Sequence, residues 1–159
     1  MRRHRGISLI ELLVTLVVVA FGLLGAALMH TRGLQSNHDA FLYSQSAALA
    51  YDIAERMRVN YAAVAAGSYN TSMGTAAATA DCYSSVCTNG AALAAGDVYD
   101  WKEQHVKALL PGADASIRYA SNIATVVIRF QGRDDGNCSA GGGAGTGYHC
   151  YTLTFDPVP

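Results

Sequence analysis

Apolar residues occupy nearly every position from Ile7 to Met29, and this run is the strongest pattern in the chain. Only Ser8, Glu11 and Thr15 are clearly polar within it. As a helix the run would be about 34 Å long, because each residue adds about 1.5 Å. A hydrocarbon core is about 30 Å thick, so the pattern predicts a segment that crosses a membrane.

A helical pattern continues beyond this apolar run. Apolar residues recur at helical spacing on one face, at Leu42, Leu49, Ile53 and Met57. We therefore expect one long helix from about Ile7 to about Val64, with its first half in the membrane and its second half packed on a domain. Glu55, Arg56 and Arg58 would form a solvated face of this helix or, alternatively, contact a neighbouring subunit.

A connecting region and a second helix follow. Residues 62–96 are rich in Ala, Gly, Ser and Thr, which predicts an irregular connection. Asp97 can cap a helix that runs to about Leu110 and ends at Pro111–Gly112. The apolar residues expected to share its buried face are Val98, Trp101 and Leu109.

The last part of the chain alternates between apolar and polar residues. This alternation predicts strands over 124–131 and 148–155, with a weaker third strand over 116–120. Three short strands of this kind form an antiparallel sheet with one buried face. The expected fold class is therefore α+β, with the outer half of the long helix packed on a small antiparallel sheet.

Glu11 discriminates between three interpretations of the N-terminal run. A secretory signal would be cut near the small residues 25–27, and a plain anchor would not be cut at all. A prepilin-type leader would be cut on the cytoplasmic side, between Gly6 and Ile7, and would leave the apolar segment in place. An acid within a membrane costs about 2.5–3.5 kcal/mol on insertion scales, and only the third interpretation gives it a role.

That role is an ion pair between subunits. Cleavage after Gly6 creates a new α-amine on Ile7, which is charged at neutral pH. Glu11 then becomes the fifth residue of the mature chain. Pairing of the Ile7 ammonium with Glu11 of a neighbour would offset much of the cost of burying both charges, and would favour one axial stagger between the helices.

Two stretches of the sequence resemble a known family. The stretch RGISLIELLVTL, residues 5–16, resembles the class III leader and first helix of type IV pilins and pseudopilins. SQSAALAYDIAERMRVN, residues 44–60, is similar to the PilV group of minor pilins, as is the D-x-x-x-W helix from Asp97 followed by L-P-G. Two positions depart from major pilins, which usually have Phe where this chain has Ile7 and often Pro where it has Leu28.

The resemblance implies a pilin-like fold and a sequence of processing steps. Prepilin peptidase would cut at Gly6/Ile7 and methylate the new amine of Ile7. The expected parts are a leader over 1–6, a transmembrane and fibre-core helix over 7–29, and a periplasmic globular domain over 30–159. The basic residues at the N-terminus agree with this topology, because positive charge stays on the cytoplasmic side.

The function implied is that of a minor pilin that primes or caps type IV pili, which serve twitching motility and adhesion. Its partners would be other minor and major pilins and the assembly platform in the inner membrane. One alternative is a pseudopilin of type II secretion. Another, of a different class, is a tip-exposed adhesin that binds ligands through the loop over 132–149.

All four cysteines lie beyond the apolar run, which predicts disulfides in an oxidising compartment. Three pairings are possible, and the short Gly- and Ser-containing loops favour Cys82–Cys87 with Cys138–Cys150. The spacing is poor for zinc, which remains an alternative together with free thiols. Asp134 and Asp135 could bind calcium but are also ordinary turn formers.

Other functions lack their usual motifs. The formal net charge is −1, and no basic stripe with interleaved aromatic residues is present, so we expect no nucleic-acid partner. The five histidines are scattered, and no nucleotide-binding or hydrolase motif occurs. We therefore expect neither an enzyme nor a cofactor.

Overall fold

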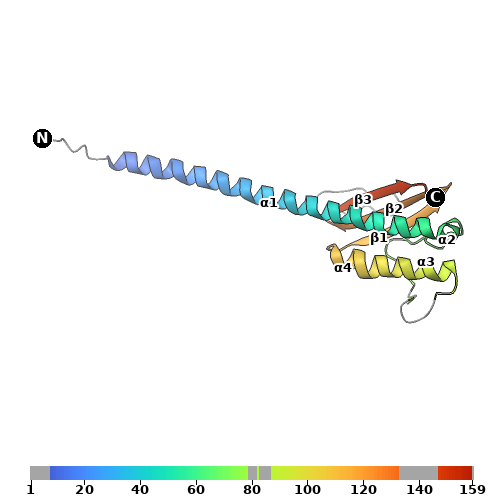
Figure 1. The fold of residues 1–159 in the computed structure, drawn as a ribbon. Coiled ribbons are helices and arrows are strands. Elements are labelled where there is room, and N and C mark those ends of the chain that lie inside the picture. Colours follow the sequence, from blue (N-terminus) through green and yellow to red (C-terminus); the bar gives the residue numbers. More distant parts are fainter. Residues whose placement is uncertain (1–7, 79–81, 83–86, 133–146, 159) are drawn as a thin grey trace. The chain divides into compact units, whose positions relative to one another are not determined.

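The computed structural model describes residues 8–78, 82, 87–132 and 147–158 (Figure 1). The chain divides into two compact units, Met1–Ala40 and Phe41–Pro159. The elements, in chain order, are the helices α1 (Leu9–Val59), α2 (Tyr61–Ala65) and α3 (Gly90–Tyr99), the π-helix η1 (Asp100–Val106), the helix α4 (Lys107–Leu109) and the strands β1 (Asp114–Ala120), β2 (Ile123–Gln131) and β3 (Tyr148–Phe155).

Helix α1 belongs to both units. Its residues in the first unit bury no side chain, whereas the part from Phe41 onward buries a continuous face. That face consists of Leu42, Ser46, Leu49, Ala50, Ile53, Ala54 and Met57. The predicted helical face is thus confirmed, and its small residues allow close packing of the helix on the rest of the unit.

Helix α1 ends earlier than the sequence predicts. It stops at Val59, and Asn60 breaks the helix with φ −111° and ψ 47° before α2 begins. The Asn60 side chain donates a hydrogen bond to the carbonyl of Gly90 at 2.8 Å. A local polar contact therefore interrupts a stretch whose residues would otherwise suit a longer helix.

The second helical region begins earlier than expected. Helix α3 starts at Gly90, and its cap is Asn89, whose side chain accepts a hydrogen bond from the N–H of Ala92 at 2.8 Å. Asp97, the predicted cap, lies inside the helix, so that prediction was wrong. The predicted end is confirmed, because Pro111 follows the helix and Gly112 adopts a φ of 58°.

The leucine that is buried near the end of this helical region is not the one expected from the sequence. Trp101 is fully buried as expected, but Leu109 is 48% exposed and Leu110 takes its place in the core. A π-helical turn inserts an extra residue and rotates the residues after it about the helix axis. Leu110 follows α4 with φ −116° and ψ 133°, outside the helix, so helical spacing does not predict its burial.

The three strands form one antiparallel sheet in the order β1-β2-β3 (Figure 1). One face carries the apolar side chains, and helical residues of the second unit pack against it. The strand residues in this core include Ala115, Ile117, Ala124, Val126, Ile128 and Phe130. The predicted α+β arrangement of a long helix on a small antiparallel sheet is confirmed.

Candidate functional site

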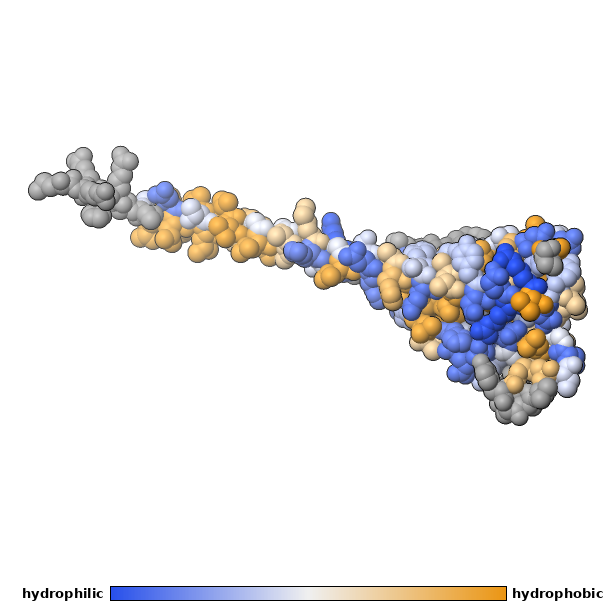
Figure 2. Space-filling view, in the orientation of Figure 1, coloured by the Kyte–Doolittle hydropathy of each residue, from blue (hydrophilic) through white to orange (hydrophobic). Residues whose placement is uncertain are grey.

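Within the first unit, the segment 9–29 of helix α1 presents an almost wholly apolar surface. Leu9 is 86% exposed, Phe21 72% and Met29 79%. Figure 2 shows apolar side chains gathered along this part of the chain. Helix α1 is the one described helix that is long and apolar enough to cross a membrane, and none of its most apolar window is buried within the chain.

The polar hydroxyls of this segment are satisfied by the helix itself. The Thr15 hydroxyl donates to the carbonyl of Leu12 at 2.9 Å, and the Thr31 hydroxyl donates to the carbonyl of Ala27 at 3.0 Å. Such bonds hide a hydroxyl from an apolar surrounding at little cost. These two polar residues therefore need no partner outside the helix.

Glu11 differs from the threonines. It lies in the first turn of α1, exposed, and its N–H bonds to the carbonyl of Ser8 at 3.0 Å. The positive end of the helix dipole favours a carboxylate there. Within the described part of the chain its carboxylate has no ion pair. Gly6 and Ile7, the predicted cleavage and methylation residues, lie outside the described residues.

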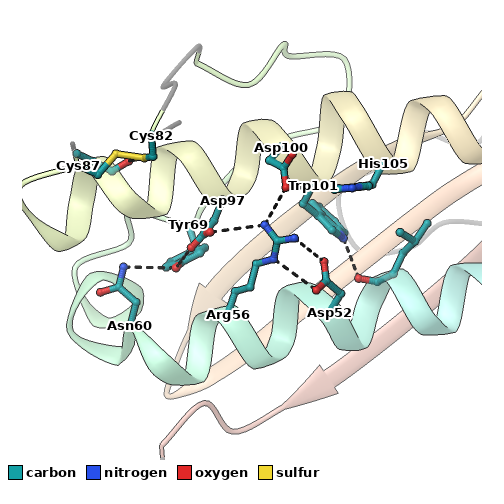
Figure 3. A network of polar contacts seen from close by, with 12 residues as sticks. Asp52, Arg56, Asn60, Tyr69, Cys82, Cys87, Asp97, Asp100, Trp101 and His105 are labelled. Carbon is teal, nitrogen blue, oxygen red and sulfur yellow. Dashed lines mark hydrogen bonds and ion pairs between the residues drawn. A yellow bond between two sulfur atoms is a disulfide. The ribbon is translucent and has the colours of Figure 1, made fainter. Parts of the chain in front are cut away.

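In the second unit, Arg56 joins α1 to the helices α3 and η1 (Figure 3). Its guanidinium nitrogens lie 3.1 Å from Asp52, 3.6 Å from Asp97 and 3.0 Å from Asp100. The Tyr69 hydroxyl donates to Asp97 at 2.7 Å, and burial together with this bond raises the pKa of Tyr69. Arg56 is thus bound within the chain, unlike the solvated or intersubunit residue expected from the sequence.

The other two charges expected on that face behave differently from Arg56. Arg58 and Glu55 form an exposed ion pair with each other. The Arg58 guanidinium also lies 5.3 Å from the centre of the Phe155 ring. Exposed pairs of this kind contribute little to stability, so this part of the face agrees with the simple prediction.

A buried lysine was not foreseen. Lys102 is fully buried, and its ammonium donates to the carbonyls of Ser72 at 2.6 Å and Thr75 at 2.7 Å. It also lies 3.2 Å from a carboxylate oxygen of Asp114. Three partners satisfy the three ammonium hydrogens, as a buried charge requires. The segment that contains Ser72 and Thr75 is thereby fixed to β1 and η1.

Asp114 completes this arrangement. Its carboxylate accepts hydrogen bonds from the N–H groups of Gly74 at 2.5 Å and Ala115 at 2.8 Å. Burial alone would raise the pKa of Asp114, but these two N–H groups and the Lys102 ammonium outweigh burial and hold that pKa below its ordinary value. Asp114 therefore stays ionised and keeps Lys102 paired.

Two family models match the chain. The model of the prokaryotic N-terminal methylation motif covers residues 1–27, and the model described as type IV pilin Tt1218-like covers residues 28–99. The chain is a type IV pilin-like protein. Comparison of this pilin with curated proteins and with solved structures gives no match.

The family assignment explains the contrast between the two units of the pilin. An exposed apolar helix that would be unstable in water suits a pilin held in the inner membrane before assembly. Pilins are structural proteins, and in the second unit of this one Arg56 and Lys102 form bonds that hold the fold together.

The cysteines of the pilin partly lie within the described residues. A disulfide joins Cys82 and Cys87, whose Cα atoms are 5.3 Å apart, and Figure 3 shows it beside α3. Cys150 lies on β3 and is disulfide-bonded. Cys138 lies outside the described residues, so the pairing of Cys138 with Cys150 stays a prediction.

No metal site is found in the part of the pilin that the structure describes, where no group of three or more metal-binding side chains occurs. Asp134 and Asp135, the calcium candidates, lie outside that part. A cavity of about 610 Å³ lies between residues 68–78, α3 and β1. The hydroxyl-bearing residues that line it are Ser68, Thr71, Ser72, Thr75 and Ser116.

Proposed function

We propose that this pilin is a minor pilin of the type IV pilus system, of the PilV group, and that it primes or caps the fibre together with other minor pilins. The observation that carries the proposal is the exposed carboxylate of Glu11, which lies in the apolar N-terminal segment of α1 and has no ion pair among the described residues. Residues 44–60 support the PilV group, because their sequence is similar to the corresponding stretch of those proteins.

Processing precedes assembly in this proposal. Prepilin peptidase removes the leader 1–6 by cutting between Gly6 and Ile7, and methylates the amine of Ile7. Residues 7–29 then stay in the inner membrane, with the N-terminus on the cytoplasmic side and residues 30–159 in the periplasm. The assembly platform passes the subunit into the fibre, which carries it to the cell surface.

Glu11 acts at the step in which helices associate. Its carboxylate pairs with the Ile7 ammonium of a neighbouring pilin, and each charge offsets the cost of holding the other in an apolar surrounding. Because the pair forms at one axial stagger only, it selects the register between neighbours. The apolar side chains around Glu11 supply packing but no register of their own.

A substitution at Glu11 tests this role. We expect Glu11→Ala to be cut and methylated but lost from sheared pili and from minor-pilin complexes, because the Ile7 ammonium would remain unpaired. The matched control is Thr15→Ala, which removes a polar group that the helix already satisfies. N-terminal sequencing reads the cut site, and immunoblots of pili and of pulled-down complexes read incorporation.

Two results would contradict the proposal. Normal entry of the Glu11→Ala variant into pili or complexes would exclude the charge pair as an assembly determinant. A mature chain that starts near Leu28 would indicate a secretory signal and not a prepilin leader.

A pseudopilin of type II secretion is the nearest alternative, since it shares the leader and the fold. Deletion distinguishes the two systems. Loss of surface pili and of twitching supports the pilus, whereas loss of exported enzymes supports secretion.

A tip-exposed binding module is the alternative of a different class. The cavity beside β1 favours it, because the hydroxyls that line it could bind a polar ligand. The loop over 132–149, which the sequence analysis expects to carry this role, lies largely outside the described residues. Deletion of that loop, or Ala95→Trp in the cavity wall, should abolish adhesion with piliation intact if this function is correct.

A further inference from the structure

The two edges of the sheet differ in how their backbone groups are satisfied. At the β1 edge, Ile117 exchanges two backbone hydrogen bonds with Thr71, at 2.9 and 3.0 Å. The N–H of Tyr119 donates to the Asn70 side chain at 2.7 Å, and the N–H of Ala115 donates to Asp114 at 2.8 Å. Every outward N–H of the middle of β1 is therefore occupied, which prevents another strand from adding there.

The direction of the backbone groups of β3 can be traced from the same bonds. Hydrogen bonding alternates along an antiparallel strand, so a residue that bonds outward on β1 does not bond to β2. Ile117 on β1 directs its backbone groups away from β2, so its partner Val126 on β2 directs its own groups toward β3. The partner of Val126 on β3 is Leu153, which therefore bonds inward to β2. The neighbours of Leu153, Thr152 and Thr154, must then direct their N–H and C=O groups away from the sheet.

These groups of β3 are open. Thr152 and Thr154 are both exposed, and within the described part of the chain neither has a backbone hydrogen-bond partner on the outer side. Two outward N–H groups and two outward C=O groups thus alternate along this edge. Among the described residues, the sheet thus protects its β1 edge and leaves the backbone groups of Thr152 and Thr154 on the β3 edge unpaired.

A flank of α1 runs beside this open edge. The Tyr43 hydroxyl lies 3.2 Å from Nδ1 of His149 at the start of β3, and Arg58 lies over the ring of Phe155 at its end. The helix is about 22 Å long between Tyr43 and Arg58, and the strand is about 20 Å long between His149 and Phe155. Because these lengths are similar, the helix segment and the strand run side by side. Tyr51 lies seven residues before Arg58, about two helical turns, which puts it on the same flank as Arg58, and it is 54% exposed.

We propose that the outer edge of β3 binds an extended segment of another pilus or pseudopilus subunit, which adds to the sheet as a fourth strand. The alternating backbone groups of Thr152 and Thr154 match an extended backbone, whereas a lipid or a helix offers no such row of partners. Apolar side chains on alternate residues of the added segment would cover Tyr51. The proposal goes beyond the Glu11 pairing, because it lies in the other unit.

A second copy of this chain is a poorer occupant. Twofold pairing of two β3 edges is antiparallel, and β3 runs in the same direction as residues 43–58 of α1. Those helix segments of the two copies would then run in opposite directions. This disagrees with the single membrane orientation proposed above, and so favours a segment from a different subunit.

Site-specific photocrosslinking tests the proposal in cells that express the full chain and its assembly system. A benzoylphenylalanine at position 152 or 154 should crosslink to one segment of one partner, with the two adducts about two residues apart in the partner. A benzoylphenylalanine at position 118, where exposed Arg118 lies on the closed β1 strand, is the control and should give at least tenfold less of that adduct.

A backbone substitution tests the hydrogen bonds themselves. Thr152→Pro removes an outward N–H that the sheet does not use, so fluorescence of Trp101 and the denaturation midpoint should change little. The crosslink from position 154 should fall at least tenfold, whereas Thr152→Val, which keeps the N–H, should retain it. If Thr152→Pro fails to fold, amide exchange of the wild-type chain replaces it, and Thr152 and Thr154 should exchange at least tenfold more slowly in the assembled state.

Three results would overturn the proposal: adducts scattered over many proteins, adducts with a second copy of this chain, or unchanged amide exchange on assembly. N-terminal sequencing and incorporation of Glu11→Ala, measured in the same cells, test the proposed function separately. A failure of one can therefore be distinguished from a failure of the other.

Discussion

The two units of this pilin use charge in opposite ways. In Phe41–Pro159, the buried Lys102 has three partners and Arg56 has three carboxylates within reach, all supplied by the same chain. In the described part of Met1–Ala40, Glu11 has an exposed carboxylate with no ion pair and a surface of apolar side chains around it.

The difference indicates where each unit finds its stability. A chain that satisfies its charges internally can fold before it meets a partner, whereas an apolar helix with a lone acid is stable only where membrane or neighbouring helices surround it. The globular unit therefore supplies a folded body, and the helix supplies the part whose energetics are completed on assembly. Substitutions that are matched in chemistry but lie in different units test this division.

The largest effect is expected from a matched pair of phenylalanines. Phe130 is fully buried and packs edge-on against Tyr43 with ring centres 5.3 Å apart, whereas Phe21 is 72% exposed. Phe130→Ala should lower the free energy of unfolding by about 3–5 kcal/mol, because it leaves a cavity in the core. Phe21→Ala should change it little. Guanidinium unfolding of the full chain in detergent, followed by Trp101 fluorescence, measures both.

Equal losses in the two phenylalanine variants would contradict the division into a folded body and a helix completed by its surroundings. The comparison is clean because Trp101, the single tryptophan, lies in the core of the globular unit and reports on that unit alone.

A pair of lysines gives the next effect. Lys102→Met removes one partner of a buried ion pair and leaves the carbonyls of Ser72 and Thr75 without their donor, which should cost about 3 kcal/mol. Lys107→Met breaks only the partly exposed pair with Glu103 and should cost less than about 1 kcal/mol. The same unfolding experiment applies. If the two variants lost equal stability, the ammonium of Lys102 would not be the group that fixes the segment.

The disulfide between Cys82 and Cys87 should contribute less. Its short loop predicts a loss of about 2 kcal/mol for the Cys82→Ser/Cys87→Ser variant, mainly through the entropy of the unfolded chain. Adding a reductant to that variant measures the contribution of the predicted Cys138–Cys150 disulfide, because any further loss of stability must come from breaking it. A variant that is as stable as the wild type would exclude a stabilising role for the first bridge.

Regular periodicity predicted most of the fold. The buried residues Leu42, Leu49, Ile53 and Met57 follow a helical period over a long helix, and the core residues of β2 lie at alternate positions, although Val127 between them is buried as well. The sequence shows these periods because each element buries one face in the core. The residues 5–16, through their resemblance to prepilin leaders, indicated the family that the comparisons then supported.

The failures occurred where one contact overrides periodicity. The side chain of Asn89 caps α3 eight residues before Asp97, the cap expected from the sequence, and Leu110, which lies beyond the end of α4, replaces Leu109 in the core. Lys102 could not be identified as buried, because its partners are main-chain carbonyls and Asp114, which have no local relation to it in the sequence. Long-range polar contacts of this kind leave no periodic trace.

The smallest effect concerns the pH dependence of the bond between Lys102 and Asp114. The pKa of Asp114 in the folded chain lies below the ordinary value of 3.8, so the unfolded chain takes up a proton first as the pH falls. The stabilisation is complete above about pH 5 and is lost as the pH falls through the folded pKa of Asp114.

Asp114→Asn should be less stable at neutral pH and should lose less stability on acidification than the wild type. Asp156→Asn is the matched control, because it removes an exposed carboxylate that forms no ion pair with Lys102. Unfolding midpoints measured by Trp101 fluorescence between pH 3 and pH 7 test this, and parallel pH curves for wild type and Asp114→Asn would show that the carboxylate of Asp114 is not held ionised by its neighbours.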